Sequence, residues 1–213
     1  MKKMLYWAVL CLPIIAYTAE ERVDIARFSQ GYLSDWQAKV FSGKTNYSLE
    51  STDGRTALRA DSKAAASGLI RKVNVNLNTT PILHWSWKVD NILAGADERT
   101  RAGDDYPARV YVVFSGGAAF WRTIAINYVW SNKQPINSNW RNAFTGNARM
   151  IAMQSGSGRV GEWVEERRDV LADYHRLFGA EPSNVDAVAI MTDTDNTSTA
   201  ATAWYGDIWF DAK

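Results

Sequence analysis

The side chains in this sequence that are best suited to chemistry include two adjacent carboxylates, Asp104 and Asp105. They stand just before a predicted strand that carries Arg109 and Tyr111 on one face. Such carboxylates could bind a cation, hold the arginine, or act as an acid/base pair. They could equally form a turn in which they accept hydrogen bonds from backbone amides. An arginine at this position needs an anionic partner or open solvent.

A second acidic group lies in residues 192–197, which read Thr-Asp-Thr-Asp-Asn-Thr. Oxygen-bearing side chains at alternate positions suit Ca²⁺, so Asp193 and Asp195 are candidate metal ligands. A solvated loop explains the same residues, because the glycine and the distal glutamate of an EF-hand are missing. The sequence therefore indicates no cofactor, with a structural calcium ion as the one alternative.

Other kinds of reactive site have little support. The only cysteine, Cys11, lies near the N-terminus, and the two histidines, His84 and His175, have no neighbouring ligand at metal-binding spacing. The sequence has no Gly-x-Ser-x-Gly nucleophile elbow, no phosphate loop and no dinucleotide fingerprint. Thiol, serine-nucleophile and nucleotide chemistry are therefore not predicted.

Aromatic residues surround a polar, amide-rich stretch at residues 131–139, which contains Asn132 and is flanked by Trp130 and Trp140. Flat rings beside amide donors suit a sugar ring, whose C–H bonds stack while its hydroxyl groups form hydrogen bonds. Alternatively, the two rings only pin the loop onto the domain. The predicted ligand-binding residues are Asp104, Asp105, Arg109, Tyr111, Tyr128, Trp130, Asn132 and Trp140.

The N-terminus has the pattern of a secretory signal peptide. Lys2 and Lys3 precede an almost wholly apolar run over residues 4–16, and polarity returns after Ala19. This run is shorter than the roughly 20 apolar residues that span a membrane, so we expect cleavage after Ala19 rather than an uncleaved anchor. The pattern predicts a signal peptide at residues 1–19 and a periplasmic or secreted bacterial protein.

The remaining residues, 20–213, carry no excess of basic charge. Removing Lys2 and Lys3 lowers the count of Lys and Arg from 24 to 22 against 23 Asp and Glu, a formal net charge of −1. This balance argues against nucleic acid and anionic membranes as partners. After the signal peptide no stretch is apolar enough to span a bilayer, and no linker or repeat divides the chain. We expect one domain, and the sequence leaves its oligomeric state open.

The hydrophobic pattern that must position these side chains has a period of two. In residues 82–89, apolar residues alternate with polar ones, which predicts a half-buried strand. Trp85, Trp87 and, in another strand-like run, Trp209 are predicted core residues. Further strands are predicted at 108–114 and 124–130, and weaker ones at 23–28, 46–50, 57–60, 67–73, 148–153, 185–191 and 203–210.

One segment, residues 169–178, has helical spacing and stops at Gly179. Before it, the mixed-charge residues 162–169 predict a solvated strand edge. About ten short strands and one short helix predict an all-β fold, a two-sheet antiparallel β-sandwich of jelly-roll type. A closed β-barrel is the structural alternative.

Several segments together resemble one bacterial protein family. They are residues 41–47, 83–87, 102–109, 127–130, 189–196 and 205–208. The most specific parts are Gly-Asp-Asp at 103–105 and Thr-Asp-Thr-Asp-Asn at 192–196. Their order and spacing resemble domain-of-unknown-function family 3047 over essentially the whole chain after the signal peptide. The resemblance implies an exported bacterial protein and brings no known activity, substrate or catalytic residue.

A looser likeness concerns the fold only. Residues 205–210 look like the closing strand of jelly-roll carbohydrate-binding modules, in which an acidic residue near this strand often helps to hold a structural Ca²⁺. Fold analogy of this kind does not assign a function.

Three functions are consistent with these features, and the first is our main hypothesis. A sheet face or rim carrying the predicted ligand-binding residues would bind a cell-envelope or environmental glycan. Alternatively, a polysaccharide hydrolase or lyase would use Asp104 or Asp105 as acid/base, with Arg109 neutralising a substrate carboxylate. That alternative requires Asp105, Arg109 and Asp193 to converge in one cleft. In the third, a structural envelope protein docks a protein partner through a flat apolar patch.

Overall fold

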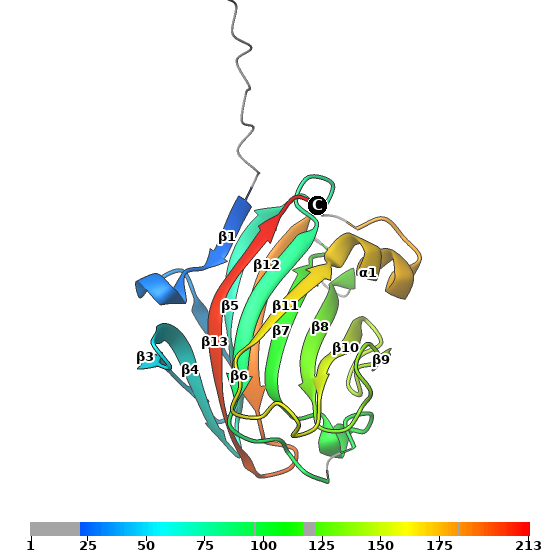
Figure 1. Cartoon of the computed structure of the whole chain (residues 1–213). Coiled ribbons are helices and arrows are strands. Elements are labelled where there is room, and N and C mark those ends of the chain that lie inside the picture. The colour runs from blue at the N-terminus through cyan, green and yellow to red at the C-terminus, as the bar shows by residue number, and fades with distance from the viewer. Residues whose placement is uncertain (1–21, 96, 117–121, 183) are drawn as a thin grey trace, which may run out of the picture.

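The segments with period-two alternation form strands of two β-sheets, which pack face to face (Figure 1). The computed structural model describes residues 22–95, 97–116, 122–182 and 184–213. The predicted signal peptide, residues 1–19, lies outside the described residues. Within them, none of the helices is long and apolar enough to cross a membrane.

The first sheet has six strands in the order β11-β6-β13-β4-β3, and β1 pairs with the far end of β13. All of its pairs are antiparallel. Its strands are β1 (Arg22–Ala26), β3 (Asn46–Thr52), β4 (Arg55–Lys63), β6 (Ile82–Val89), β11 (Val164–Asp169) and β13 (Ala200–Asp211). The charged strand β11 lies at an edge of this sheet, as the mixed-charge run predicted.

The second sheet has seven strands in the order β2-β5-β12-β7-β8-β10-β9. Its strands are β2 (Gln37–Ser42), β5 (Ala66–Val75), β7 (Tyr106–Phe114), β8 (Ile124–Ser131), β9 (Asn139–Arg141), β10 (Ala148–Ser155) and β12 (Val185–Asp193). The two-sheet sandwich is confirmed, with one departure from the antiparallel prediction, since β8 and β10 run parallel. The chain therefore returns between them through a segment that includes β9.

The core fills the space between the two sheets, and aromatic rings from both sheets meet there. On β6, the side chains of Trp85 and Trp87 are fully buried, as predicted. Trp85 lies 5.2 Å from Tyr128 and Trp87 lies 6.0 Å from Trp130, measured between ring centroids. Because successive side chains of a strand point to opposite faces, the residues between these rings face away from the core.

The helical elements whose bounds lie within the described residues are one α-helix and two short 3₁₀ turns. They are α1 (Val170–Phe178), η1 (Phe28–Gln30) and η2 (Arg101–Gly103). The predicted helix at 169–178 is thus confirmed within one residue. The Asp169 carboxylate caps its start by accepting a hydrogen bond from the Ala172 amide, and Gly179 ends it in the left-handed conformation.

Trp209, predicted as a core residue, lies instead on the outer face of the six-stranded sheet. It stacks on His84 at a ring distance of 4.9 Å and beneath the guanidinium of Arg22. The pairing of β13 with β6 shifts register between Tyr205 and Ile208, so a bulge reverses the faces of the residues that follow. The prediction for Trp209 is therefore wrong because this bulge interrupts the alternation.

Candidate functional site

Side chains on the outer face of the seven-stranded sheet surround a cavity of about 790 Å³. Arg109 and Tyr111 on β7 and Asn127 on β8 form part of its floor, and they alternate with the core residues Val110 and Ile126. The cavity is lined by residues 41, 42, 66, 104, 109, 111, 123, 125, 127, 142, 144, 145, 147, 148, 191, 193, 195 and 196. It therefore lies over the middle strands β12, β7 and β8, next to the end of β12.

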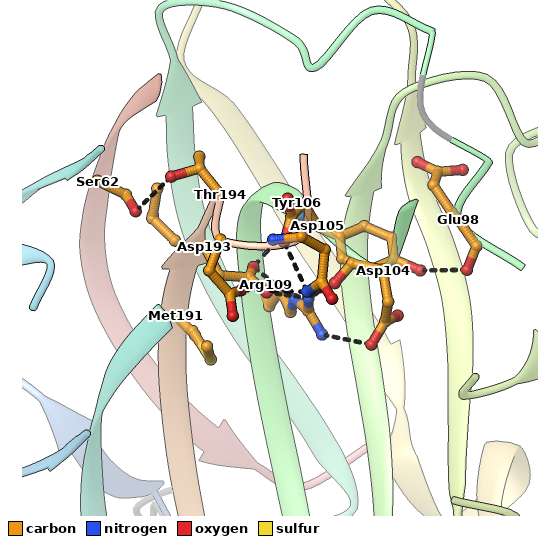
Figure 2. A network of polar contacts seen from close by, with 12 residues as sticks. Ser62, Glu98, Asp104, Asp105, Tyr106, Arg109, Met191, Asp193 and Thr194 are labelled. Atoms are coloured by element: carbon orange, nitrogen blue, oxygen red, sulfur yellow. Dashed lines mark hydrogen bonds and ion pairs between the residues drawn. The ribbon is translucent and has the colours of Figure 1, made fainter. Parts of the chain in front are cut away.

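A buried guanidinium organises the floor of this cavity (Figure 2). The Nε of Arg109 donates to Asp193 Oδ1 at 2.8 Å, and its Nη2 donates both to Asp193 Oδ2 and to the backbone carbonyl of Asp104. Its remaining Nη1 lies 3.8 Å from Asp104 Oδ2, and the Tyr106 ring lies 4.2 Å from the guanidinium carbon. Arg109 is only 4% exposed, so it has the anionic partner that the sequence required.

Asp104 is the carboxylate on the other side of this guanidinium. Its Oδ2 accepts a hydrogen bond from Asn142 Nδ2 at 2.8 Å. Its Oδ1 is buried and has no hydrogen-bond partner among the described residues, and the same is true of Asn127 Oδ1. Both side chains line the cavity, so its floor holds two buried acceptors that this part of the chain leaves unsatisfied.

Asp105 points the other way and holds the turn between β12 and β13. Its Oδ2 accepts hydrogen bonds from the amide and the hydroxyl of Thr197, at 2.6 and 2.7 Å. Its Oδ1 accepts from the amide and the side chain of Asn196. Both oxygens are thus occupied, and Asp105 acts as the backbone-binding turn residue that was the alternative to a chemical role in the sequence analysis.

The segment before β7 places the two aspartates through close packing. A side chain at Gly103 would lie 2.4 Å from the backbone oxygen of Asp97, so only glycine fits there. Glu98, which is fully buried, accepts hydrogen bonds from Ser131 Oγ and the Asn132 amide. Asn132 Nδ2 in turn donates to the carbonyl of Asp105 at 3.3 Å. This chain of contacts fixes the turn that carries Asp104.

Two exposed phenylalanines stand at the rim of the cavity. Phe41 is 67% exposed and Phe144 is 52% exposed. Phe41 lies where the pairing of β2 with β5 shifts register between Val40 and Ser42, and such a bulge re-aims a side chain. Phe144 lies in the segment that returns from β8 to β10.

Burial and crowding of like charges change the acid–base properties of the floor. Burial raises the pKa of Asp193 to about 8, and the carboxylates of Asp105 and Asp104 add to this rise while Arg109 opposes it. Burial opposes the charge on Arg109, yet Asp193 raises the pKa of its guanidinium well above the usual value. Burial also raises the pKa of Asp195, and Asp105 adds to the rise.

The acidic residues predicted to bind calcium do lie together. One carboxylate oxygen each from Asp105, Asp193 and Asp195 lies within 4.8 Å of the others. However, Asp193 is paired with Arg109, and Asp105 is engaged by the turn that follows β12. Three carboxylates with two of them occupied fall short of the six to eight oxygen ligands that Ca²⁺ takes. Calcium binding by Asp193 and Asp195 stays a prediction.

The structure brings together three of the eight predicted ligand-binding residues, Asp104, Arg109 and Tyr111, at the cavity. Asp105 adjoins them without lining it. Tyr128 and Trp130 are fully buried in the core, where a ligand has no access.

Asn132 and Trp140 are also buried and lie outside the cavity lining. Asn132 accepts a hydrogen bond from the Leu93 amide at 2.7 Å. Trp140 packs in a small apolar cluster with Val129 and Met150. The rings that flank the amide-rich loop therefore pin it onto the sheet, which was the alternative interpretation of that pattern.

Sequence reasoning missed most of the residues that line the cavity, among them Phe41, Asn127, Asn142 and Phe144. Asn127 could have been found, because it lies between the core-facing residues Ile126 and Tyr128 of a predicted strand. The two phenylalanines carry no comparable signal, since their positions depend on a bulge and on a return segment.

The profile of the family described as "Protein of unknown function (DUF3047)" matches residues 34–209. The chain belongs to the DUF3047 family. This finding confirms the resemblance that the sequence segments indicated. No curated protein matches this DUF3047 chain.

Solved structures similar to this DUF3047 protein include carbohydrate-binding modules. A family 29 module is 10% identical, with 91% of this chain and 90% of the module covered, at a TM-score of 0.44. The CBM22-1 xylan-binding domain from Paenibacillus barcinonensis Xyn10C is 14% identical, with 93% and 99% covered, at a TM-score of 0.42. Identities and TM-scores this low carry no information about the ligand of the present protein.

Proposed function

We propose that this protein binds a glycan in the cavity on the outer face of its seven-stranded sheet. The observation that carries the proposal is that exposed rings and buried polar groups line the same cavity. Phe41 and Phe144 stand at its rim, while Asp104, Arg109 and Asn127 lie in its floor. Sugars are recognised in this way, because their C–H faces pack on rings and their hydroxyl groups bind fixed polar side chains.

The cavity has the size and the rigidity that such binding needs. Its volume of about 790 Å³ lies within the range of roughly 300–1,000 Å³ that is typical of ligand sites. Arg109, Asp193 and Asp104 hold one another, so their side chains lose little freedom when a ligand arrives. A floor that is already ordered favours affinity for a ligand rich in hydroxyl groups.

The predicted signal peptide suggests where the glycan would be encountered. We propose that the protein works in the periplasm or outside the cell, so that its ligand belongs to the cell envelope or the surroundings. Fractionation of cells that produce the full chain tests this part, with the protein expected in the periplasmic or culture fraction. Recovery in the cytoplasmic fraction alone would contradict it.

A titration with a panel of oligosaccharides, followed by calorimetry, tests glycan binding. We expect Phe41→Ala and Phe144→Ala each to lower the affinity about threefold to tenfold, since each removes one ring contact. Tyr32→Ala is the matched control, because Tyr32 is 53% exposed but lies outside the cavity. Failure of every glycan to bind, or equal losses in all three variants, would refute the proposal.

A polysaccharide hydrolase or lyase is the second candidate, and one observation favours it. Asp193 lines the cavity with a pKa raised to about 8 by burial, and the Asp195 carboxylate lies within 4.8 Å of it. Of the three residues that this candidate requires in one cleft, Arg109 and Asp193 line the cavity and pair with each other, whereas Asp105 adjoins them without lining it. Incubation of each bound glycan with the protein, followed by assay for new reducing ends or unsaturated sugars, distinguishes catalysis from binding alone.

A further inference from the structure

The charges around the cavity are unequal. Among the described lining residues, three side chains are carboxylic acids, Asp104, Asp193 and Asp195, and one is basic, Arg109. Even with Asp193 protonated, two carboxylates face one guanidinium. Water screens these charges only weakly, because Asp104 is 4% exposed and Asp193 is 3% exposed.

The single guanidinium is poorly placed to bind an anionic ligand. Two of its nitrogens donate to Asp193, and one of these also donates to the carbonyl of Asp104. One face of the guanidinium is covered by the ring of Tyr106, which is fully buried. Nη1 makes no hydrogen bond among the described residues, but it lies 3.8 Å from Asp104 Oδ2, so a ligand carboxylate bound there would lie beside another carboxylate. This geometry therefore disfavours the role of Arg109 in neutralising a substrate carboxylate.

The unsatisfied groups of the floor favour a ligand that donates hydrogen bonds and carries positive charge. Asp104 Oδ1 and Asn127 Oδ1 are both acceptors, both buried, and both without a partner among the described residues. A buried acceptor that stays unpaired costs free energy, and a ligand whose donor comes within hydrogen-bond distance of such an oxygen lowers this cost. A donor that also carries positive charge gains most beside carboxylates.

We propose that the glycan of this cavity carries a free amino group, whose ammonium binds the acidic floor beside Asp104 and Asp195. This inference rests on the proposed glycan binding and names the class of sugar. An ammonium has three donors and no acceptor, which matches a floor with spare acceptors. A divalent cation matches it less well, because Arg109 and the turn after β12 already occupy Asp193 and Asp105.

Three oligosaccharides that differ only at the second carbon of each sugar test the proposal. They are β-1,4-linked oligomers of glucosamine, N-acetylglucosamine and glucose of equal length, titrated at pH 6, where an amino group is protonated. We expect the glucosamine oligomer to bind about tenfold more tightly than the other two, since it adds a charge-assisted hydrogen bond. The difference should shrink as salt is added.

Two variants show whether the preference comes from the cavity. Asp195→Asn should reduce the preference for the amino sugar severalfold, because it removes one lining carboxylate. Asp90→Asn changes the net charge equally, but Asp90 is exposed and outside the cavity, so the preference should remain. An equal reduction in both variants would overturn the proposal in favour of general electrostatic attraction.

The outcomes separate this inference from the function on which it rests. If none of the three oligomers nor any other glycan binds, glycan binding itself is refuted. If the neutral or acetylated oligomer binds as well as the amino oligomer, glycan binding stands and the amino-sugar inference fails. Calcium chloride that binds alone, and whose binding Asp195→Asn abolishes, would also overturn the inference, because a metal would then satisfy the acidic floor.

Discussion

Two arginines, one on the outer face of each sheet, have similar partners in different surroundings. Arg59 on β4 pairs with Glu50 at 2.9 Å and Asp61 at 2.8 Å, and its side chain is 35% exposed. Arg109 on β7 also contacts two carboxylates, but its side chain is only 5% exposed. Water screens the first group, whereas burial makes the second a rigid part of a cavity floor.

The aromatic rings of the two faces differ in the same way. On the six-stranded sheet, Trp163 lies beneath Arg55 at 4.6 Å and Trp209 beneath Arg22 at 4.5 Å. These rings are covered by their own cations. On the other face, Phe41 is 67% exposed at the rim of the cavity, and Phe144 stays 52% exposed although Arg101 lies 5.3 Å from its ring. The comparison teaches that an aromatic and charged sheet face suggests a binding site only where rings and polar groups remain available.

The largest expected effect is the loss of the buried arginine. Arg109→Met leaves Asp104 and Asp193 buried without their guanidinium, and we expect it to lower the free energy of unfolding by about 3–5 kcal/mol at pH 9, where Asp193 is ionised in the natural protein. Urea unfolding of the purified variant measures this loss. A cost below about 1 kcal/mol is typical of exposed ion pairs. Such a result would remove the contrast between Arg59 and Arg109, because burial of Arg109 would then have no energetic consequence.

A pH series tests the carboxylate that Arg109 holds. Burial raises the pKa of Asp193 to about 8, above the value of about 3.9 expected in the unfolded chain. Between these values the folded state keeps a proton that the unfolded state loses, so stability falls as the pH rises. We expect a contribution of up to about 1.4 kcal/mol per pH unit from this one group.

Urea unfolding at pH 5, 6 and 7, compared between the natural protein and Asp193→Asn, isolates that contribution. Other titrating groups act in both proteins, so only the difference in slope reports on Asp193. A shallower slope in the variant is expected. Identical slopes would show that Arg109 keeps Asp193 ionised throughout, as in an ordinary ion pair.

The smallest expected effect belongs to the exposed arginine. Arg59→Met removes two partly exposed ion pairs and a cation that lies 5.5 Å from the Trp204 ring. We expect the free energy of unfolding to change by about 0–1 kcal/mol, less at high salt. A loss as large as that of Arg109→Met would remove the distinction between the two faces.

The fold could be predicted wherever alternation was strong. The strand at residues 82–89 has the predicted bounds, because its apolar and polar residues alternate, although seven of its eight residues are buried rather than one face alone. Strand β2 (Gln37–Ser42) was missed, since all six of its residues are exposed and no apolar face marks it. Trp209 was assigned to the wrong face because a bulge between Tyr205 and Ile208 shifts the alternation by one residue.

The candidate site was predictable to the extent that it depends on residue type. A turn carboxylate and a strand arginine must find partners, which identified Asp104 and Arg109. Local sequence does not show which distant side chain pairs with Arg109. That partner is Asp193, and the contact depends on the pairing of β7 with β12. Nor does local sequence reveal that Trp130 faces inward, since a polar loop beside a ring suits a pinned loop as well as a ligand.

The parallel pairing of β8 and β10 has a consequence for how this cavity can diversify. Parallel neighbours require the chain to travel back before it pairs again, and the return path, residues 132–147, carries Asn142 and Phe144 to the cavity. Within this path Trp140 packs in a buried cluster, whereas residues 144–147 are exposed. Insertions between Asn142 and Asn147 can therefore remodel what the protein recognises while the register of every core strand, and the charged floor beneath, stays unchanged.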